Sequence, residues 1–153
     1  IIHDNKTYSN TSKTLWRKDI IWVPQDRVSE HGTPREFYEK VRCYHCRNSN
    51  AEQSNDEVSS LTPMEIASNW SMREEVFDKP WSQLSGGEAQ RAAIAIAISL
   101  NPSILLLDEP TSACDYATTV QIEESLKKSG ITILIVSHDL AQVSRISNCE
   151  IQI

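Results

Sequence analysis

Glycine is scarce in this 153-residue chain, which contains four glycines, at positions 32, 86, 87 and 130. An average globular protein is about 7% glycine, which corresponds to about eleven residues at this length. None of the four precedes a lysine, so the sequence contains no Walker A phosphate-binding loop of the pattern G-x-x-x-x-G-K-[ST]. The same scarcity excludes a Rossmann G-x-G-x-x-G turn, a collagen-like repeat and a Gly/Ser-rich linker.

The sequence also lacks long apolar runs and an excess of positive charge. Its longest apolar stretches, residues 92–100 and 131–136, have about half or less of the roughly 18 residues that a membrane span needs. The net charge of −6 argues against a nucleic-acid binder with a basic face, so we expect no nucleic-acid partner. A hydrophobic content of 39% and a charged content of 24% exclude a wholly disordered chain.

The N-terminal residues, Ile1-Ile2-His3-Asp4, show neither the basic segment nor the apolar stretch of a signal peptide. The chain does not begin with methionine, and we therefore expect it to begin inside a longer sequence. Without a secretory signal, the four cysteines favour reduced intracellular thiols over a disulfide framework. These features predict a cytoplasmic protein.

One cysteine pair, in Cys43-Tyr44-His45-Cys46, has the spacing of half a zinc site. A structural zinc site needs four ligands, and no second Cys-x-x-Cys is present to complete it. We therefore interpret the pair as ordinary thiols, and Cys149 as a packed thiol. The four tryptophans are expected to pack in the core or in a subdomain: Trp16, Trp22, Trp70 and Trp81.

The first half of the chain shows few regular elements. In order, it is expected to contain a β-strand at Ile20–Val23 that stops at Pro24, a short helix at residues 36–41 and an acidic, solvated loop at residues 48–60. A further helix is predicted from Thr62 as N-cap, with Pro63 in its first turn and Glu65 at the third position. This helix should end near residue 70.

The second half is strongly patterned. A helix that is apolar almost all round is predicted over residues 85–100, and it should be buried. Two continuous aliphatic runs, residues 104–107 and 131–136, have the pattern of parallel strands buried on both faces. A helix over residues 116–128 lies between them and ends at Gly130. Strand, helix and strand in this order predict a right-handed βαβ unit.

Polar side chains follow both of these strands. Asp108 and Glu109 come directly after the first run, and His138 follows the second. Ligands bind outside the carboxyl ends of parallel strands, so we expect these side chains to meet at one edge of the sheet. One carboxylate there can hold Mg²⁺, the next can orient or deprotonate a water, and the histidine can hydrogen-bond a phosphoryl group. Each of these residues alone is more often structural.

Ser85-Gly86-Gly87 adds a polar feature at the start of a helix. Unpaired N–H groups and the helix dipole attract anions at such a place, and glycines let a ligand approach the backbone closely. On their own, these three residues favour an ordinary N-cap with two turn glycines.

In combination, these features resemble the motifs of the ATP-binding cassette (ABC) ATPases. Residues 84–91, Leu-Ser-Gly-Gly-Glu-Ala-Gln-Arg, are similar to the signature motif, and residues 104–112 to the Walker B strand with its extension. Residues 112–115, Ser-Ala-Cys-Asp, resemble the D-loop, Val136-Ser137-His138-Asp139 the H-loop, and Val23-Pro24-Gln25 the Q-loop. Five motifs in the order of the family make a chance match negligible. The resemblance covers nearly the whole chain.

The resemblance implies an α/β fold, namely the P-loop NTPase-type parallel sheet of an ABC nucleotide-binding domain with a helical subdomain, truncated at its N-terminus. Residues 1–29 and 101–153 are expected to form the ATPase core. Residues 30–100 are expected to form the helical subdomain, which ends in the signature helix.

The resemblance also implies a role for each matched residue. Asp108 is the Mg²⁺ residue, and Gln25 senses the γ-phosphate and Mg²⁺ and links the core to the helical subdomain. Glu109 is the general base, and His138 touches the γ-phosphate. The signature turn, with Ser85, Gly86 and Gly87, contacts the γ-phosphate of a nucleotide held by the opposite subunit. The D-loop crosses the dimer interface with Asp115.

The sequence departs from the family's pattern in two places. Cys114 stands where the D-loop usually has leucine, and we expect only a mild loosening of its packing. The larger departure is the missing Walker A loop, which holds the nucleotide phosphates in P-loop ATPases. The aromatic residue that stacks on adenine is missing too. We therefore expect an ATPase when the chain is joined to that segment, and no activity from the isolated chain.

The leading hypothesis is an ATP-binding and ATP-hydrolysing subunit that couples hydrolysis to transport. ATP and Mg²⁺ are its implied cofactors. Its implied partners are a second ABC ATPase subunit, in a homo- or heterodimer, and a separate membrane-spanning subunit, which would place the chain on the cytosolic face of a membrane. DNA-repair relatives are disfavoured because 58 residues between Gln25 and Leu84 leave no room for a long coiled coil. The alternative is a non-catalytic fragment, or a module that completes a partner's ATP site.

Overall fold

A computed structural model of the chain describes residues 2–3, 6–7, 17–26, 28, 30–47 and 61–149, without the side chains of residues 2–3, 6–7 and 44–47. Its strands are β1 (Ile2–His3), β2 (Lys6–Thr7), β3 (Ile20–Val23), β4 (Ile104–Asp108) and β5 (Thr132–Val136). Its helices are α2 (Pro34–Arg47), α3 (Pro63–Ser68), α4 (Gly86–Ser99), α5 (Tyr116–Lys128) and α6 (Leu140–Ile146), with the short 3₁₀ helices η2 (Glu74–Asp78) and η3 (Trp81–Gln83). The predictions for Trp16, for the loop at residues 48–60 and for the Cys46 side chain lie outside these residues.

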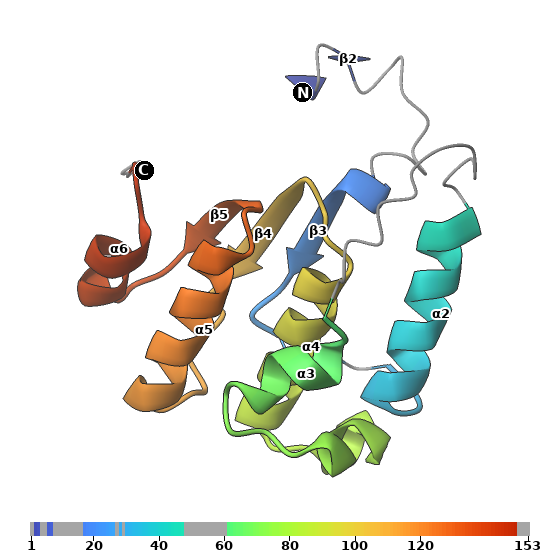
Figure 1. Ribbon diagram of the computed structural model, residues 1–153. Coiled ribbons are helices and arrows are strands. Elements are labelled where there is room, and N and C mark those ends of the chain that lie inside the picture. The colour runs from blue at the N-terminus through green and yellow to red at the C-terminus, as the bar shows by residue number, and fades with distance from the viewer. Residues whose placement is uncertain are drawn as a thin grey trace.

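The strands β3, β4 and β5 form a parallel sheet with β4 in the middle (Figure 1). Val23 lies opposite Leu107, which in turn lies opposite Ile135, so the three strands end at the same edge. All three are runs of β-branched and aliphatic residues, as the sequence predicts. The parallel pairing of β4 with β5 across α5 confirms the expected strand–helix–strand unit. The short strands β1 and β2 pair antiparallel with each other.

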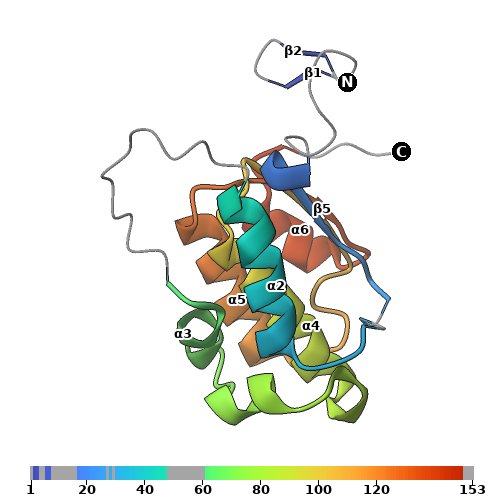
Figure 2. The same ribbon diagram turned by 90° about the vertical axis from the view of Figure 1, so that its right-hand side faces the viewer.

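Helices cover one face of this sheet (Figure 2). On that face Leu105 and Leu107 of β4 are buried. On the other face Trp22, Leu134 and Val136 are 63%, 58% and 54% exposed. The prediction of strands buried on both faces is therefore wrong for the part of the chain that the structure describes, because none of its helices packs on the second face. The prediction that Trp22 lies in the core is wrong for the same reason.

Two helices of the region between β3 and β4 begin with the same capping arrangement. At α3 the Thr62 hydroxyl accepts from the Glu65 amide at 3.3 Å and the Glu65 carboxylate accepts from the Thr62 amide at 2.7 Å, which confirms the predicted N-cap. Thr33 and Glu36 make the equivalent bonds at 3.2 Å and 3.0 Å before α2. The predicted helix at residues 36–41 is too short, because α2 spans Pro34–Arg47. The capping box of Thr33 and Glu36 accounts for the earlier start of the helix.

A hydrophobic cluster joins these helices to the sheet. Trp70, Phe77 and Trp81 are completely or almost completely buried in it, as predicted for the two tryptophans. Burial of one such aromatic ring contributes about 2–3 kcal/mol. Consecutive residues of α4, such as Ala95 and Ile96, are buried as well, which confirms a helix that is apolar almost all round. The division into an ATPase core and a helical subdomain stays a prediction.

Two of the cysteines that the structure describes lie on the surface. Cys43 and Cys149 are exposed, so the prediction of a packed thiol at Cys149 is wrong. Within the described ranges, no three His, Cys, Asp or Glu side chains are grouped in a way that would hold a metal ion. None of the helices seen there combines the length and the apolar character needed to span a membrane.

Candidate functional site

The carboxyl edge of the sheet brings together the acidic pair and the histidine that the sequence singles out. Asp108 is the last residue of β4, and its Cα is paired with that of Val136 at the end of β5. Glu109 follows directly, and its carboxylate Oε1 accepts a hydrogen bond of 2.7 Å from the backbone N–H of His138. The His138 Nε2 atom lies 3.5 Å from the same oxygen. Neighbouring strands thus place a carboxylate and an imidazole in contact, as predicted.

Glu109 adopts an unusual backbone conformation. Its φ angle is +45°, in the left-handed region that L-residues with a Cβ atom rarely occupy, at a cost of about 1 kcal/mol or more. The backbone N–H of Glu109 donates to the carbonyl of Val136 at 2.9 Å, which extends the β4–β5 ladder by one bond and holds this conformation. The Glu109 side chain is only 13% exposed, whereas that of His138 is 93% exposed. The carboxylate is therefore fixed, and the imidazole faces outward.

The D-loop residue Asp115 is the N-cap of α5. Its carboxylate accepts from the Thr118 backbone N–H at 2.9 Å and from the Thr118 hydroxyl at 2.8 Å. These bonds hold the pKa of Asp115 below its usual range, and the bond from the Thr118 backbone N–H has the larger effect. The neighbouring Cys114 is half-buried against the core, and burial raises the pKa of its thiol. The capping role of Asp115 was missed, although Asp directly before a helix is a common N-cap signal.

The signature turn is also a capped helix start. Ser85 is the N-cap of α4: its Oγ accepts from the Glu88 backbone N–H at 3.2 Å, and its own N–H donates to the Glu88 carboxylate at 2.8 Å. The Ser85 hydroxyl donates to that carboxylate at 2.8 Å as well. Its backbone and hydroxyl bonds lower the pKa of Glu88. The ordinary N-cap interpretation of Ser85 is therefore correct, and it is compatible with a ligand at the same helix end.

The signature turn packs directly on the D-loop of the same chain. A Cβ atom added to Gly87 would lie 2.6 Å from the Ala113 carbonyl oxygen, closer than real Cβ atoms come to such a group. A Cβ atom at Gly86 would meet the Ala113 Cβ at 3.7 Å, an ordinary contact. Gly87 is therefore needed for a close approach between two backbones. The sequence predicts that these glycines let a ligand approach the backbone closely. It contains no signal for this contact within the chain.

Gln25 lies in the exposed loop that follows β3, at the same edge of the sheet as Asp108 and Glu109. Mg²⁺ prefers oxygen ligands and usually takes one or two carboxylates together with water and phosphate oxygens. The Asp108 carboxylate at the end of β4 and the Gln25 amide oxygen in the loop after the neighbouring β3 are ligands of this kind. The residues at this edge therefore suit a nucleotide-bound Mg²⁺ better than a metal site made of protein ligands alone.

A pocket of about 250 Å³ lies at this edge, between the loops that follow β4 and β5 and the helices α5 and α6. Glu109 and Cys114 line it from the segment after β4, and Ser137 and Asp139 from the segment after β5. Gln142 of α6, which sequence reasoning did not consider, lines it as well. The predicted catalytic residue Glu109 is thus beside a hollow that can take a small polar group.

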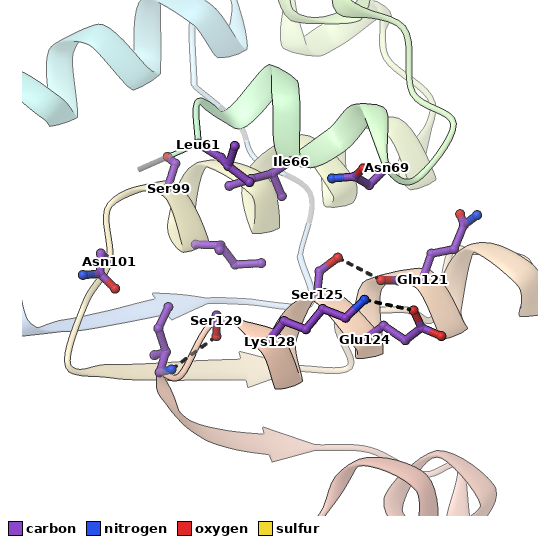
Figure 3. Close-up of a pocket in the computed structure, with 12 residues that line it drawn as sticks. Leu61, Ile66, Asn69, Ser99, Asn101, Gln121, Glu124, Ser125, Lys128 and Ser129 are labelled. Atoms are coloured by element: carbon purple, nitrogen blue, oxygen red, sulfur yellow. Dashed lines mark hydrogen bonds and ion pairs between the residues drawn. The ribbon is translucent and has the colours of Figure 1, made fainter. Parts of the chain in front are cut away.

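A second, larger pocket of about 590 Å³ lies between α3, the end of α4, and α5 (Figure 3). Leu61 and Ile66 line its apolar side, and Glu124 and Lys128 of α5 form an ion pair at its rim with 3.5 Å between Oε2 and Nζ. Asn101 also lines this pocket and lies shortly before β4. The pocket is therefore near the amino edge of the sheet, whereas Asp108 and Glu109 lie at the carboxyl edge. Of the predicted site residues, Glu109 lines the smaller pocket and none lines this larger one.

A parallel sheet with an acidic pair and a histidine at its carboxyl edge, next to a glycine-containing helix start, places the chain in the class of P-loop NTPases. Within that class the chain belongs to the ATP-binding cassette family: the family model described as "ABC transporter" matches residues 1–112.

Similar proteins and structures agree with this assignment. The chain is 37% identical over 117 residues to "Phosphate import ATP-binding protein PstB 2" of Lactococcus lactis, and 43% identical over 104 residues to "Phosphate import ATP-binding protein PstB 1" of Lactiplantibacillus plantarum. These alignments cover 75% and 67% of this chain but 44% and 38% of the relatives. The chain thus spans less than half the length of these curated relatives.

Among solved structures, a dimeric ATP-binding cassette in a post-hydrolysis state, bound to ADP and phosphate, has a TM-score of 0.68 at 27% identity; the match covers 92% of this chain and 63% of that one. A bacterial Atm1-family ABC exporter with ATP bound has a TM-score of 0.67 at 28% identity, covering 92% of this chain and 25% of that one. The predicted fold class, an ABC nucleotide-binding domain, is confirmed.

Proposed function

We propose that this chain is the catalytic and signature-bearing part of an ATP-binding and ATP-hydrolysing subunit that couples hydrolysis to transport through a separate membrane protein. The observation that carries the proposal is the contact at the carboxyl edge. There a nearly buried carboxylate, Glu109, is held by the His138 backbone N–H, and the His138 imidazole lies 3.5 Å away. Membership of the ABC family supports the assignment of these two residues to hydrolysis.

The proposed roles are those that the resemblance to the ABC family implies for the matched residues. Bound ATP supplies the phosphoryl group, and Mg²⁺ compensates its negative charge. Asp108 and Gln25 hold the Mg²⁺. The Glu109 carboxylate orients the attacking water and accepts a proton from it, since one of its oxygens is already fixed by the His138 amide. The exposed His138 imidazole donates a hydrogen bond to the γ-phosphate.

A second subunit completes the site in this proposal, as a homo- or heterodimer. Ser85, Gly86 and Gly87 contact the γ-phosphate of the nucleotide on the opposite subunit, and the D-loop around Asp115 crosses the interface. The close packing of Gly87 on Ala113 supports this arrangement, because it makes the signature turn and the D-loop parts of one surface. One of the similar solved structures is described as a dimer.

The segment that holds the nucleotide phosphates is absent from the 153 residues, since no glycine in them precedes a lysine. We propose that this segment belongs to the same whole protein and covers the open face of the sheet. The exposure of Trp22, Leu134 and Val136 supports that proposal, because apolar strand residues of this size are normally covered. The greater length of the relatives supports it as well.

The membrane-spanning partner is a separate protein in this proposal, and the subunit lies on the cytosolic face of the membrane. The names of the two relatives indicate phosphate import as the transport process to examine first.

The test is Glu109→Gln in the whole gene product. Loss of the carboxylate removes the proton acceptor, so ATP hydrolysis should fall to background while ATP binding is retained. Phosphate release and equilibrium nucleotide binding measure the two quantities. The matched control is Glu124→Gln, which removes an exposed carboxylate on α5 at the other pocket and should leave turnover unchanged. Unchanged turnover in Glu109→Gln would disprove the assigned base.

The alternative function, a module without its own ATP site, is decided by the coding sequence upstream of Ile1. An in-frame G-x-x-x-x-G-K-[ST] within about 60 residues is expected if the chain is part of an ordinary ATPase. If that motif is absent and the whole gene product does not bind ATP, the enzyme hypothesis is wrong, and the chain is a non-catalytic fragment or a module that completes a partner's ATP site.

A further inference from the structure

A buried acidic residue lies behind the candidate site. Glu123, in the middle of α5, has a side chain that is 4% exposed. A buried carboxylate is strongly destabilising unless hydrogen bonds and an opposite charge compensate it. Arg145 of α6 provides both: its Nε lies 2.9 Å from one carboxylate oxygen of Glu123 and its Nη2 lies 2.9 Å from the other. This bidentate ion pair joins α5 to α6.

The same carboxylate is connected to the catalytic segment through Gln142. This residue of α6 is 2% exposed, and its Nε2 donates to Glu123 at 3.2 Å and to the Thr111 hydroxyl at 2.8 Å. Thr111 lies two residues after Glu109 in the chain, and Gln142 lies four residues after His138. A continuous row of side chains therefore runs from α5 through α6 to the loop that contains the proposed base.

The two loops that follow β4 and β5 are both attached to this row. The H-loop leads into α6, whose N-cap Asp139 accepts from the Ala141 amide at 2.9 Å. The D-loop leads into α5, and the Arg145 guanidinium lies 5.3 Å from the centre of the ring of Tyr116, the first residue of that helix. Thr111 lies in the same loop after β4, directly before the D-loop residue Ser112. The row therefore fixes the position of α6 relative to the loop after β4, which contains Glu109.

We propose that Glu123, Gln142 and Arg145 are positioning residues for ATP hydrolysis, which hold the H-loop against the loop of the general base so that the His138 amide and Glu109 stay in contact. The inference rests on the proposed function for its effect on turnover. None of the three residues touches the reacting groups in this assignment. They act through the 2.7 Å hydrogen bond between the His138 N–H and Glu109.

The first experiment replaces Gln142 by methionine in the whole gene product. Methionine has a similar length and cannot donate a hydrogen bond, so Thr111 is released while the Glu123–Arg145 pair remains. Turnover should fall about tenfold or more, because small displacements of catalytic groups are costly. The KM for ATP and the number of nucleotides bound per chain should stay unchanged. The matched control is Gln121→Met on α5, at the other pocket, which should leave turnover unchanged.

A second measurement separates positioning from folding and does not need activity. Hydrogen exchange at the His138 amide should accelerate in Gln142→Met, because its acceptor Glu109 is no longer held in place. The amides of Val143 and Ser147, which donate to Asp139 and Val143 within and at the end of α6, should exchange as in the wild type. Faster exchange at all three amides would show that α6 simply unfolds, and would overturn the proposal.

The inference and the proposed function fail in different ways. If turnover and bound nucleotide decrease in the same proportion, or if turnover and His138 exchange are both unchanged, the positioning role is wrong. If the whole protein does not hydrolyse ATP, the proposed function is wrong, and the exchange rate of the His138 amide alone decides whether Gln142 positions the H-loop.

Discussion

At Gly87 a hydrogen atom in place of a side chain lets the start of α4 touch the loop that follows β4. The Ala113 carbonyl oxygen occupies the place where a Cβ atom would stand, 2.6 Å away. The neighbouring Gly86 has room, since its nearest contact is the Ala113 Cβ at 3.7 Å. The two adjacent glycines therefore have different roles. Gly87 permits a close backbone contact within the chain, whereas a side chain at Gly86 would have room.

Gly87→Ala should destabilise the protein by about 1–3 kcal/mol, the usual result of forcing an extra methyl group against well-packed atoms. Gly86→Ala should be neutral or stabilising, because alanine favours helix and its Cβ makes an ordinary contact. Urea unfolding of the whole gene product measures both changes. Equal stability of the two variants would contradict the internal packing of the signature turn on the D-loop.

At the scale of the helices, one sequence pattern recurs. Thr or Ser followed three residues later by Glu begins α2, α3 and α4, and in each case the hydroxyl and the carboxylate exchange hydrogen bonds with the other residue's backbone. The three capping boxes explain where these helices begin. Two of the capping carboxylates, those of Glu65 and Glu88, also have lowered pKa values, so they link helix capping to pH.

The capping carboxylates should make stability fall at low pH. The pKa values of Glu65 and Glu88 are lowered from 4.5 by hydrogen bonds from Thr62 and Ser85. In the window below 4.5 the unfolded chain therefore takes up more protons than the folded one, and acid favours unfolding. This stabilisation is complete above the unfolded pKa and is lost as the pH falls through the lowered folded values.

The double variant Glu65→Gln with Glu88→Gln keeps an oxygen that can accept the capping bonds but removes the titration. Its free energy of unfolding should depend less steeply on pH below about 4.5 than that of the wild type. Urea unfolding at a series of pH values measures the slope. Glu39→Gln, an exposed position on α2, is the control. A slope unchanged from wild type would show that the caps do not contribute to acid sensitivity.

Local patterns at this scale predict much of the fold, and their failures have physical reasons. The strands β3, β4 and β5 and the helices α4 and α5 follow directly from aliphatic runs and caps. The helix α6 was missed because its seven residues contain too short a pattern. The row from Glu123 to Thr111 was missed because its members come from three separate segments, and only the folded chain brings them together.

At the scale of the whole molecule, the sheet is asymmetric. One face is covered by helices, and the opposite face exposes Trp22 and Leu134 at the middle of β3 and β5. The aliphatic runs predicted burial on both faces because each strand carries apolar residues on both of its sides. In our proposal the segment that holds the nucleotide phosphates covers the open face. The absence of that one segment from the 153 residues would then explain both the open face and the missing phosphate-binding loop.

Site-specific alkylation can test this. In the whole gene product a cysteine introduced by Leu134→Cys should react slowly with a maleimide, because the upstream segment covers it. Ser144→Cys, at an exposed position of α6, should react rapidly and serves as the control. Peptide mass spectrometry separates both positions from the exposed Cys43 and Cys149. Equal reactivity of the two introduced cysteines would mean that the open face stays uncovered, and the missing segment would then have to bind elsewhere.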